Sequence, residues 1–428
     1  MARLGVLMVL PLLLLGWLQG CGGSGKGEQA VAVYIGRRAD QCSDMPACTA
    51  SSAVTSCPAS FGSGAGDDWD SMSVYSGSGT YEARYGHGVV DFGGQILIIG
   101  GLKVSSADSA EREGLSDIWT LSLSTRDSTA AIQRIEDDAG FLGRGLFSSV
   151  VHVDGSATAR VYIFGGMTGA STTASDAWRS VDGDGGGTWE NVASPSTTPR
   201  INSVLLSSAG RLFLIGGGDS DCDVKVSSKS DPISWATAEL PTGTTELCGP
   251  SAGIVYGTRI IVYSFRSDRM YAQILQWSEA ETSLSVLKSR WELTTDGGST
   301  LVFSGVGKAV LVGRTPYIVG SSSSTGRQRI FHAAEGGLDT ASAWTEKGAN
   351  SCGSGAWCDT STGTAAIYSD GLLCLSGGLK SDPQRRSLQQ ELGHGQQGER
   401  RAVTGSSGVW CSGAQFDAPA VSRTLIPV

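Results

Sequence analysis

Short apolar runs recur along the middle of the chain, and four of them stop at a pair of glycines. The runs are rich in β-branched and aromatic residues, a composition that favours strands over helices. They are continuous rather than alternating, which is typical of strands buried on both faces. The four runs, each with its glycine pair, are Gln95–Gly101, Val161–Gly166, Arg211–Gly217 and Gly371–Gly378.

Further strands are predicted on both sides of each run. A short turn separates the run from an upstream strand, which makes a hairpin. The upstream strands are Tyr85–Asp91, Ser148–Asp154, Asn202–Ser208 and Thr364–Asp370. Downstream, a third strand carries Trp119 or Trp178 in an Asp-x-Trp sequence, and a fourth lies near another tryptophan. Four strands in a unit is the pattern of a β-propeller blade.

The units recur roughly every 54 residues, which indicates a repeat architecture rather than a β-sandwich. Two units without a glycine pair fill the interval after Gly217: one runs from Ile254 to Trp291, and the other begins with strands at Leu301–Ser304 and Ala309–Gly313 and ends at Trp344. We therefore predict an all-β chain folded as a single β-propeller of six four-stranded blades. An extra strand at Val31–Ile35 keeps seven blades open.

Closure of the ring requires the two ends of the propeller to share one blade. The segment Asp67–Val74 has the form of a closing strand, although it precedes the first hairpin. We expect it to complete the last unit beside Gly408–Cys411. A bridge between Cys374 and Cys411 would then join neighbouring strands.

The order of hairpin, glycine pair, Asp-x-Trp strand and closing tryptophan resembles the kelch repeat. The central domain of galactose oxidase is a propeller of this kelch type. The nearest matches are Arg84–His87 and Leu115–Trp119, and Asp176–Trp189 resembles a lengthened Asp-box turn of sialidases. Both families are propellers, so the resemblance implies that fold. The residues that define the repeats are Gly100, Gly101, Trp119, Gly165, Gly166, Trp178, Trp189, Gly216, Gly217, Trp235, Trp291, Trp344, Gly377 and Gly378.

The N-terminus predicts export. The apolar run Leu4–Leu18 is about fifteen residues long, shorter than the ~20 that span a bilayer, and indicates a signal peptide over residues 1–20. Leu18–Cys21 resembles a bacterial lipobox, which implies lipid attachment at Cys21, although Gln19 departs from that motif. Cleavage near Gly20 to give a freely secreted protein is the alternative.

The mature chain divides into two parts. Residues 21–66 form a Cys-, Ser- and Gly-rich segment, and residues 67–428 form the propeller. Within the propeller, residues 380–407 are polar and predict a flexible insertion.

The ten cysteines predict disulfides, because bridges persist in an oxidising compartment. Lipidation of Cys21 would leave an odd number, which argues against the lipobox. The candidates are Cys42, Cys48, Cys57, Cys222, Cys248, Cys352, Cys358, Cys374 and Cys411. With four histidines and no pair of CxxC motifs, we predict no zinc site.

The net charge limits the classes of partner that we expect. The net charge of −9 and the absence of basic runs exclude nucleic acid as an expected partner. Asp219, Asp221 and Asp223 alternate as in a calcium loop, but the EF-hand glycine and distal glutamate are missing, so a solvated acidic turn is preferred. We predict no metal and no cofactor.

The sequence does not identify a ligand. We expect a monomeric extracellular binding module for a protein or glycan, tethered to a membrane only if lipidated. A carbohydrate-active enzyme, sialidase-like or sialate-mutarotase-like, and a structural matrix or cell-wall protein are the alternatives. The sialidase resemblance implies an arginine triad, yet an arginine that opens a strand pair more often has a structural role; the candidates are Arg84, Arg144, Arg200, Arg259 and Arg314. We assign no catalytic residues, and four scattered histidines do not suit the copper site of galactose oxidase.

Overall fold

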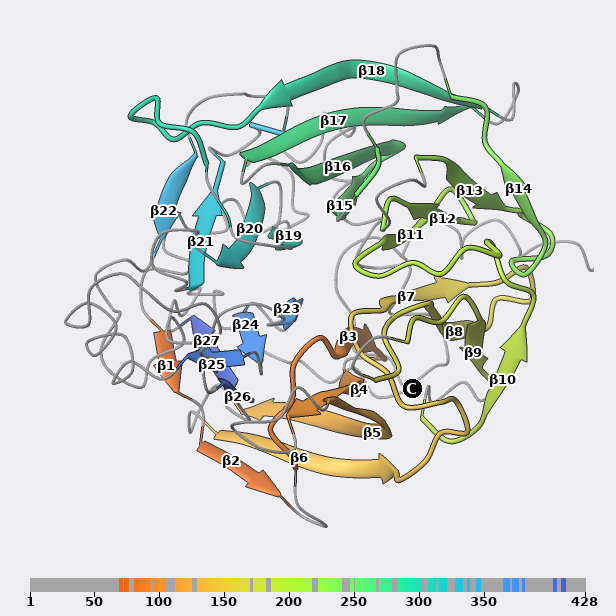
Figure 1. The fold of residues 1–428 in the computed structure, drawn as a ribbon, viewed down its shortest axis with the longest axis vertical. Coiled ribbons are helices and arrows are strands. Elements are labelled where there is room, and N and C mark those ends of the chain that lie inside the picture. Colours follow the sequence, from red (N-terminus) through yellow and green to blue (C-terminus); the bar gives the residue numbers. More distant parts are fainter. Residues whose placement is uncertain are drawn as a thin grey trace, which may run out of the picture.

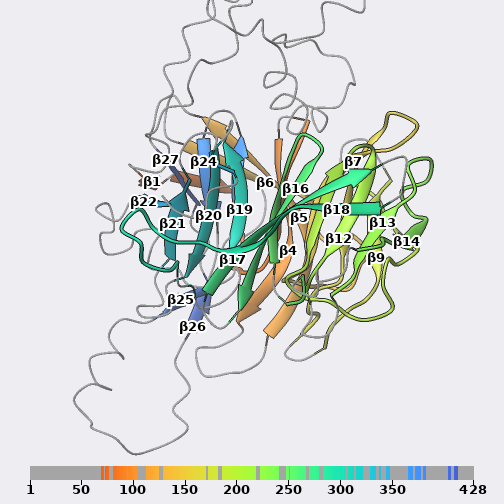
Figure 2. The same ribbon diagram turned by 90° about the horizontal axis from the view of Figure 1, so that it is seen from above.

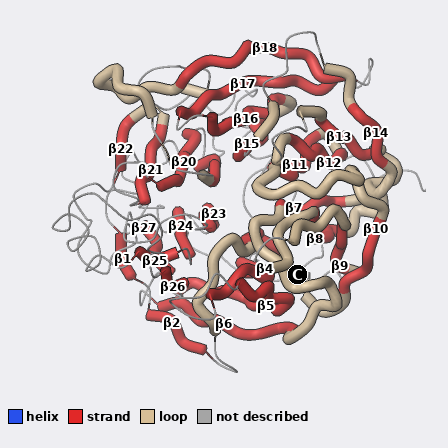
Figure 3. The backbone as a smooth tube through the Cα atoms, in the orientation of Figure 1, coloured by secondary structure: helices blue, strands red, loops and turns tan. Residues whose placement is uncertain are grey.

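The computed structural model describes most of residues 69–347 and, beyond them, only strands between 365 and 412. Its larger internal gaps are at 105–111, 241–246, 322–327 and 348–364. All regular secondary structure in this part is β-strand (Figure 3). No helix in the described ranges is long and apolar enough to cross a membrane. The signal peptide, Cys21 and the other cysteines before residue 69 lie outside these ranges.

The strands form radial sheets around one axis, so the chain is a single all-β propeller (Figure 1). The first sheet contains β2 (Ser73–Ser76), β3 (Gly88–Phe92), β4 (Gln95–Val104), β5 (Arg112–Ser124) and β6 (Thr129–Glu136). The next contains β7 (Ser148–Val153), β8 (Ala159–Phe164), β9 (Ala177–Ser180) and β10 (Trp189–Val192). The third contains β11 (Val204–Ser208), β12 (Arg211–Ile215), β13 (Val224–Ser227) and β14 (Trp235–Thr237).

Three further sheets complete the ring. One contains β15 (Ser251–Tyr256), β16 (Arg259–Arg266), β17 (Arg269–Ser278) and β18 (Ser283–Glu292). Another contains β19 (Lys308–Val312), β20 (Thr315–Ser321), β21 (Gln328–His332) and β22 (Thr345–Lys347). The closing blade contains β23 (Ala365–Ser369), β24 (Leu372–Ser376), β27 (Val409–Ser412) and β1 (Trp69–Ser71).

The prediction of six four-stranded blades is wrong. Five blades have four strands each, but the β3–β6 sheet has a fifth, because β2 pairs in parallel with β6 from Ser73 opposite Thr129 to Ser76 opposite Ile132. The seven-bladed alternative is wrong as well. The innermost strands β3, β7, β11, β15, β19 and β23 contact one another in that order, and β23 contacts β3, which closes the circle.

The ring closes as the sequence predicts. β1 pairs with β27, with Trp69 opposite Ser412, and β27 pairs with β24. The backbone register places Cys374 directly opposite Cys411. Because β2 follows β1 closely and lies on the neighbouring sheet, the segment 69–76 spans the seam between the closing blade and the first sheet.

One degenerate unit begins later than its pattern suggests. Its first two strands are β19 and β20, with Lys308 opposite Val319, whereas Leu301 and Phe303 lie in the connection that precedes them. Both connection residues are almost fully buried among the aromatic side chains of two blades. Their apolar character therefore reflects packing between sheets rather than membership of a strand.

The flanks of the predicted polar insertion pair with each other. β25 (Leu379–Ser381) is antiparallel to β26 (Val403–Gly405), and β26 contacts β4 at one end of the ring (Figure 2). The residues between these two strands lie outside the described ranges.

The core lies between adjacent sheets and is built from the second strands. In β4, β8, β12 and β16 the central residues are 0–3% exposed, as the continuous apolar runs predict. Phe213 of one blade packs edge-on against Trp277 of the next, with ring centroids 5.5 Å apart. Each apolar side chain of this size contributes about 1.5–3 kcal/mol when fully buried.

Candidate functional site

The two ends of the ring are built differently. Strands alternate in direction, so the turns between first and second strands lie at one end and the connections from second to third strands lie at the other. We call the first end the hairpin face. The second is the clamp face, where the glycine pairs lie.

The glycine pairs turn the backbone away from the second strand. Gly100 and Gly101 have φ angles of 53° and 119°, and the equivalent residues in the next two blades are also left-handed. At Gly217 a Cβ would lie 2.3 Å from that of Ser203. Only glycine fits both the conformation and the space.

A buried arginine holds the end of the β3–β6 sheet. Arg84 donates from Nη1 to the Gly100 carbonyl at 2.9 Å and makes two bonds to the Asp117 carboxylate at 2.6 and 2.8 Å. Trp119 Nε1 donates to the same carboxylate at 2.5 Å. The guanidinium also lies 4.5 Å from the centre of the Tyr81 ring. We call this arrangement of arginine, glycine carbonyl and aspartate a clamp.

The β7–β10 blade repeats the clamp closely. Arg144 donates to the Gly165 carbonyl at 3.1 Å and to Asp176 at 2.5 and 2.9 Å. Trp178 Nε1 donates to Asp176 at 2.6 Å. Phe141 lies under this guanidinium at 5.8 Å, as Tyr81 does in the first sheet.

A third clamp differs in one member. Arg200 donates to the Gly216 carbonyl at 3.2 Å and to the Asp223 carboxylate. The residue two positions after this aspartate is lysine instead of tryptophan, and Lys225 Nζ lies 2.6 Å from Asp223 Oδ2. A charged amine therefore takes the place of the indole.

The clamp contacts shift the pKa values of three clamp residues toward their charged forms. Burial lowers the pKa of Arg84, but the hydrogen bonds to Asp117 and the charges around the guanidinium together outweigh burial and raise it. Burial raises the pKa of Asp176, but the hydrogen bonds from Arg144 and Trp178 and the charge of Arg144 together outweigh it and lower the pKa. The pKa of Asp223 is likewise lowered, because Lys225 and Arg200 outweigh its burial.

Backbone hydrogen bonds link each of the three clamped sheets to the blade that follows it. The second glycine of a pair donates its N–H to the next blade: Gly101 to Arg144 at 2.7 Å, and Gly166 to Arg200 at 2.9 Å. At the following seam Gly217 donates to Gly249 at 2.8 Å, so a glycine carbonyl replaces that of the arginine.

An arm projects from the clamp face beyond the first glycine pair. It consists of Leu102–Val104 and Arg112–Leu115, paired from Leu102 opposite Gly114 to Val104 opposite Arg112. A loop of the next blade, whose described parts are 167–169 and 172–175, lies beside it. Arg112 Nη1 is 3.6 Å from Met167 Sδ across the contact.

This arm-and-loop surface is polar. Lys103 Nζ lies 3.2 Å from Glu82 and 3.1 Å from Glu113, and Glu113 is 59% exposed. On the loop, Thr172 and Thr173 are exposed. The surface therefore offers both signs of charge together with hydroxyl groups.

Two of the four histidines are buried near the axis. Burial, together with the charges of Arg84 and Lys308, lowers the pKa of His87 to about 3. Burial lowers that of His152 to about 4, against the influence of Asp154, and its Nδ1 lies 2.9 Å from Ser207 Oγ in the next blade. Both rings are neutral at physiological pH. His152 connects two blades, and His87 is packed in the interior.

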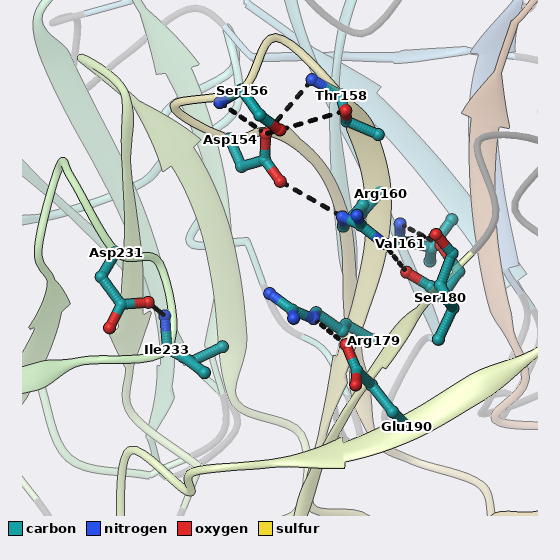
Figure 4. Close-up of polar contacts among 11 residues, drawn as sticks. Asp154, Ser156, Thr158, Arg160, Val161, Arg179, Ser180, Glu190, Asp231 and Ile233 are labelled. Carbon is teal, nitrogen blue, oxygen red and sulfur yellow. Dashed lines mark hydrogen bonds and ion pairs between the residues drawn. The ribbon is translucent and has the colours of Figure 1, made fainter.

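The hairpin face carries a separate polar network (Figure 4). Asp154 accepts bonds from the Ser156 and Thr158 amides and from Arg160 Nε. Arg160 also donates to the Ser180 carbonyl at 3.1 Å, and Ser180 Oγ accepts from the Val161 amide at 3.0 Å. All of these partners close turns within one blade.

The next blade repeats that construction. Arg211 donates to the Ser227 carbonyl at 2.9 Å, and Ser227 Oγ accepts from the Leu212 amide at 2.8 Å. The connection between β9 and β10 is the segment whose sequence resembles the Asp-box, and its residues 182–185 lie outside the described residues. The connection between β13 and β14 is held by the same pattern of hydrogen bonds but lacks the Asp-box sequence.

The predicted site residues fall into three groups. Trp119, Trp178, Trp189, Trp235 and Trp291 lie on third or fourth strands, and Trp344 directly precedes β22. Cys222 and Cys248 form a disulfide. Gly377, Gly378, Cys352, Cys358, Asp219, Asp221 and Arg314 lie outside the described residues, as do the side chains of Cys374 and Cys411.

Asp223 does not serve a calcium loop, because Arg200 and Lys225 occupy its carboxylate. Among the described residues no group of His, Cys, Asp and Glu is arranged to hold a metal ion. The sequence missed the pairing of the arginines with aspartates 23 to 33 positions later.

Comparison with known proteins adds fold-level similarity. No protein-family model matches the chain, and no curated protein matches its sequence. A solved structure titled as that of YjhT is 12% identical with a TM-score of 0.47, covering 70% of this chain and 92% of that one. A mutant α-L-arabinofuranosidase (arb93a) from Fusarium graminearum, in complex with an iminosugar inhibitor, is 13% identical with a TM-score of 0.46, covering 80% and 98%. The similarity concerns the fold.

Proposed function

We propose that this chain is an exported β-propeller of the kelch type that binds a protein or glycan partner through its clamp face. The observation that carries the proposal is the arm-and-loop surface, where a projecting hairpin and a neighbouring loop meet above rigidly clamped strand ends. Loops held by a rigid scaffold are where proteins most often place binding residues.

Support for the kelch type comes from the clamps. The glycine pair and the Asp-x-Trp sequence, far apart along the chain, converge on one arginine in each of two blades. The third clamp keeps the glycine pair and the aspartate but has Lys225 where the motif has tryptophan. One hydrogen-bonded unit therefore accounts for the repeated residues.

The engaged arginines favour binding over hydrolysis. A sialidase-like triad needs guanidinium groups that reach a substrate carboxylate, as the resemblance implies. Arg84, Arg144 and Arg200 have side chains only 0–1% exposed, and each already bonds a carboxylate and a glycine carbonyl of its own blade. Their charge serves the scaffold.

Export is supported by the disulfide between Cys222 and Cys248, which suits an oxidising compartment. We propose that residues 1–20 are removed. Intact-mass analysis of the mature protein distinguishes a diacylglycerol-modified Cys21 from a free N-terminus, because the lipid adds its own mass.

The proposal is tested with the mature protein on a glycan array and against immobilised surface proteins of the producing cell. The ligand found is then titrated against the double variant Arg112→Glu, Thr172→Glu, which alters the arm and the loop without touching a clamp. Affinity should fall by about tenfold or more. Ser234→Arg on the hairpin face is the control and should leave affinity unchanged. Loss of affinity in the control alone would overturn the assignment of the face.

A further inference from the structure

In each of the three clamped sheets a bond joins the chain beside the clamp aspartate to the connection that leads into the next blade. We call this bond the tie, and in one sheet it is a disulfide instead of a hydrogen bond. The residue just before the clamp aspartate is Ser116, Ser175 or Cys222. In each sheet this residue is joined to the connection that leads into the next blade.

Hydrogen bonds make the first two ties. The Ser116 carbonyl accepts from the Ala139 amide at 3.1 Å, and Ser116 Oγ donates to Asp138 at 3.0 Å. The Ser175 carbonyl accepts from Ser194 Oγ. Both partner segments lie in the connections between one blade and the next.

A covalent bond makes the third tie. Cys222 is bonded to Cys248, which lies in the connection between β14 and β15. Asp223 follows immediately and is held by Arg200 and Lys225. Gly249, which follows Cys248, accepts a hydrogen bond from the amide of Gly217, the second glycine of the β11–β14 blade. The disulfide thus lies between the third clamp and the seam.

We propose that the Cys222–Cys248 disulfide is a redox-sensitive tie, and that its reduction by a dithiol loosens the third clamp and the adjoining seam. The step is balanced: the S–S bond takes two electrons and two protons to give two thiols, while the dithiol becomes a cyclic disulfide. A thiol is a weak hydrogen-bond donor, so the reduced cysteines hold the two segments less firmly than the S–S bond does.

The proposal concerns regulation of the clamp face and rests on the proposed function only for its effect on ligand binding. The third clamp also starts from weaker support than the others. In place of an indole held in the strand it uses the flexible chain of Lys225, which is 19% exposed. Loss of the tie should therefore loosen the third clamp before it loosens the seam.

Hydrogen exchange of the full mature protein, oxidised and dithiol-treated, tests the tie without any ligand. Amides of 223–226, 249, 251 and 252 should exchange on the order of tenfold faster after reduction, whereas those of 176–179 should not change. The double variant Cys222→Ser, Cys248→Ser should show the fast exchange from the start, and the dithiol should add nothing. This variant separates the tie from other cysteines of the chain. Ser194→Ala, which removes the second tie, should instead affect 175–179 under either condition.

Unchanged exchange at 223–226 after mass spectrometry has shown both thiols free would overturn the proposal. So would detection of Cys222 and Cys248 as free thiols in the untreated protein. If the oxidised protein binds no ligand at all, the proposed function fails while the exchange result still decides the tie.

Discussion

The clamped blades and the two blades that follow them hold the same end of the ring by different means. In the β7–β10 and β11–β14 sheets the second strand ends at left-handed glycines, and in the β3–β6 sheet the β4–β5 ladder shifts register there before it continues to Val104 opposite Arg112. In all three sheets an arginine bonds the carbonyl of the first glycine. In the β15–β18 blade, β16 and β17 instead stay paired to Arg266 opposite Arg269. In the β19–β22 blade the ladder likewise reaches Ser321 opposite Gln328.

The difference extends to the seams. Between the two unclamped blades the seal is aromatic, because Phe303 lies against Gly320 and packs edge-on against Phe265 and Phe331 at 6.0 and 5.5 Å. A strand end that completes its own ladder needs no side-chain donor, so an apolar residue suffices there. Where left-handed glycines interrupt the ladder, a charged clamp supplies a donor for the glycine carbonyl that the ladder leaves free.

Phe303→Ala should have the largest effect on stability, because the aromatic seal is fully buried. We expect a loss of about 4 kcal/mol in the free energy of unfolding, measured by urea denaturation. The exposed Leu287→Ala on β18 is the control and should cost less than about 0.5 kcal/mol. Equal losses for the two variants would show that the seam is not sealed by Phe303.

Arg144→Met should cost about 3 kcal/mol, since it leaves the Gly165 carbonyl without its donor and Asp176 without its partner. The estimate is at the lower end for a buried pair because Asp176 is 36% exposed and water can reach it. Arg269→Met on an unclamped blade, whose side chain is 55% exposed beside Glu292, should cost less than about 0.5 kcal/mol. A clamp variant no worse than this control would refute the structural role of the arginine.

Acid should loosen the clamped part of the ring first. His87 and His152 are neutral in the fold, with pKa values of about 3 and about 4, so each favours the folded state fully only above the unfolded value of about 6.5. As the pH falls from 7 to 5, each should cost about 2 kcal/mol. Below pH 4, protonation of Asp176 and Asp223, whose pKa values are lowered, then weakens two clamps.

Hydrogen exchange read strand by strand checks this order. Strands β3, β7 and β11 should lose protection before β16 and β17 as the pH is lowered. Loss of protection in β16 and β17 at the higher pH would contradict it.

Local patterns predicted the strands well because each run and its turn lie within a few residues. The apolar runs before Gly100 and Gly165 became buried second strands, and the closing strand at Trp69 was recognised from its own sequence. The separate strand at Ser73–Ser76 was missed, because its first two residues were assigned to the closing strand and its partner β6 lies more than fifty residues away.

The clamps were only partly predictable for the same reason. Asp117 and Asp176 stand in Asp-x-Trp sequences, but nothing local pairs them with Arg84 and Arg144 some thirty positions earlier. Asp223 was harder to interpret, because Lys225 replaces the tryptophan and the neighbouring aspartates imitate a calcium loop. Spatial convergence of residues from distant strands decides these roles.

The most direct test of the central claim is one titration that follows binding and turnover in the same sample. Mature protein is titrated with the glycan or protein found on the arrays, by calorimetry, and the mixture is then analysed for released sugar or other product. The account predicts saturable binding, with no product, whose affinity falls by about tenfold or more in the double variant Arg112→Glu, Thr172→Glu. Product release that Arg144→Lys abolishes, while the folded state is retained, would contradict it, because the arginine would then serve chemistry rather than the scaffold.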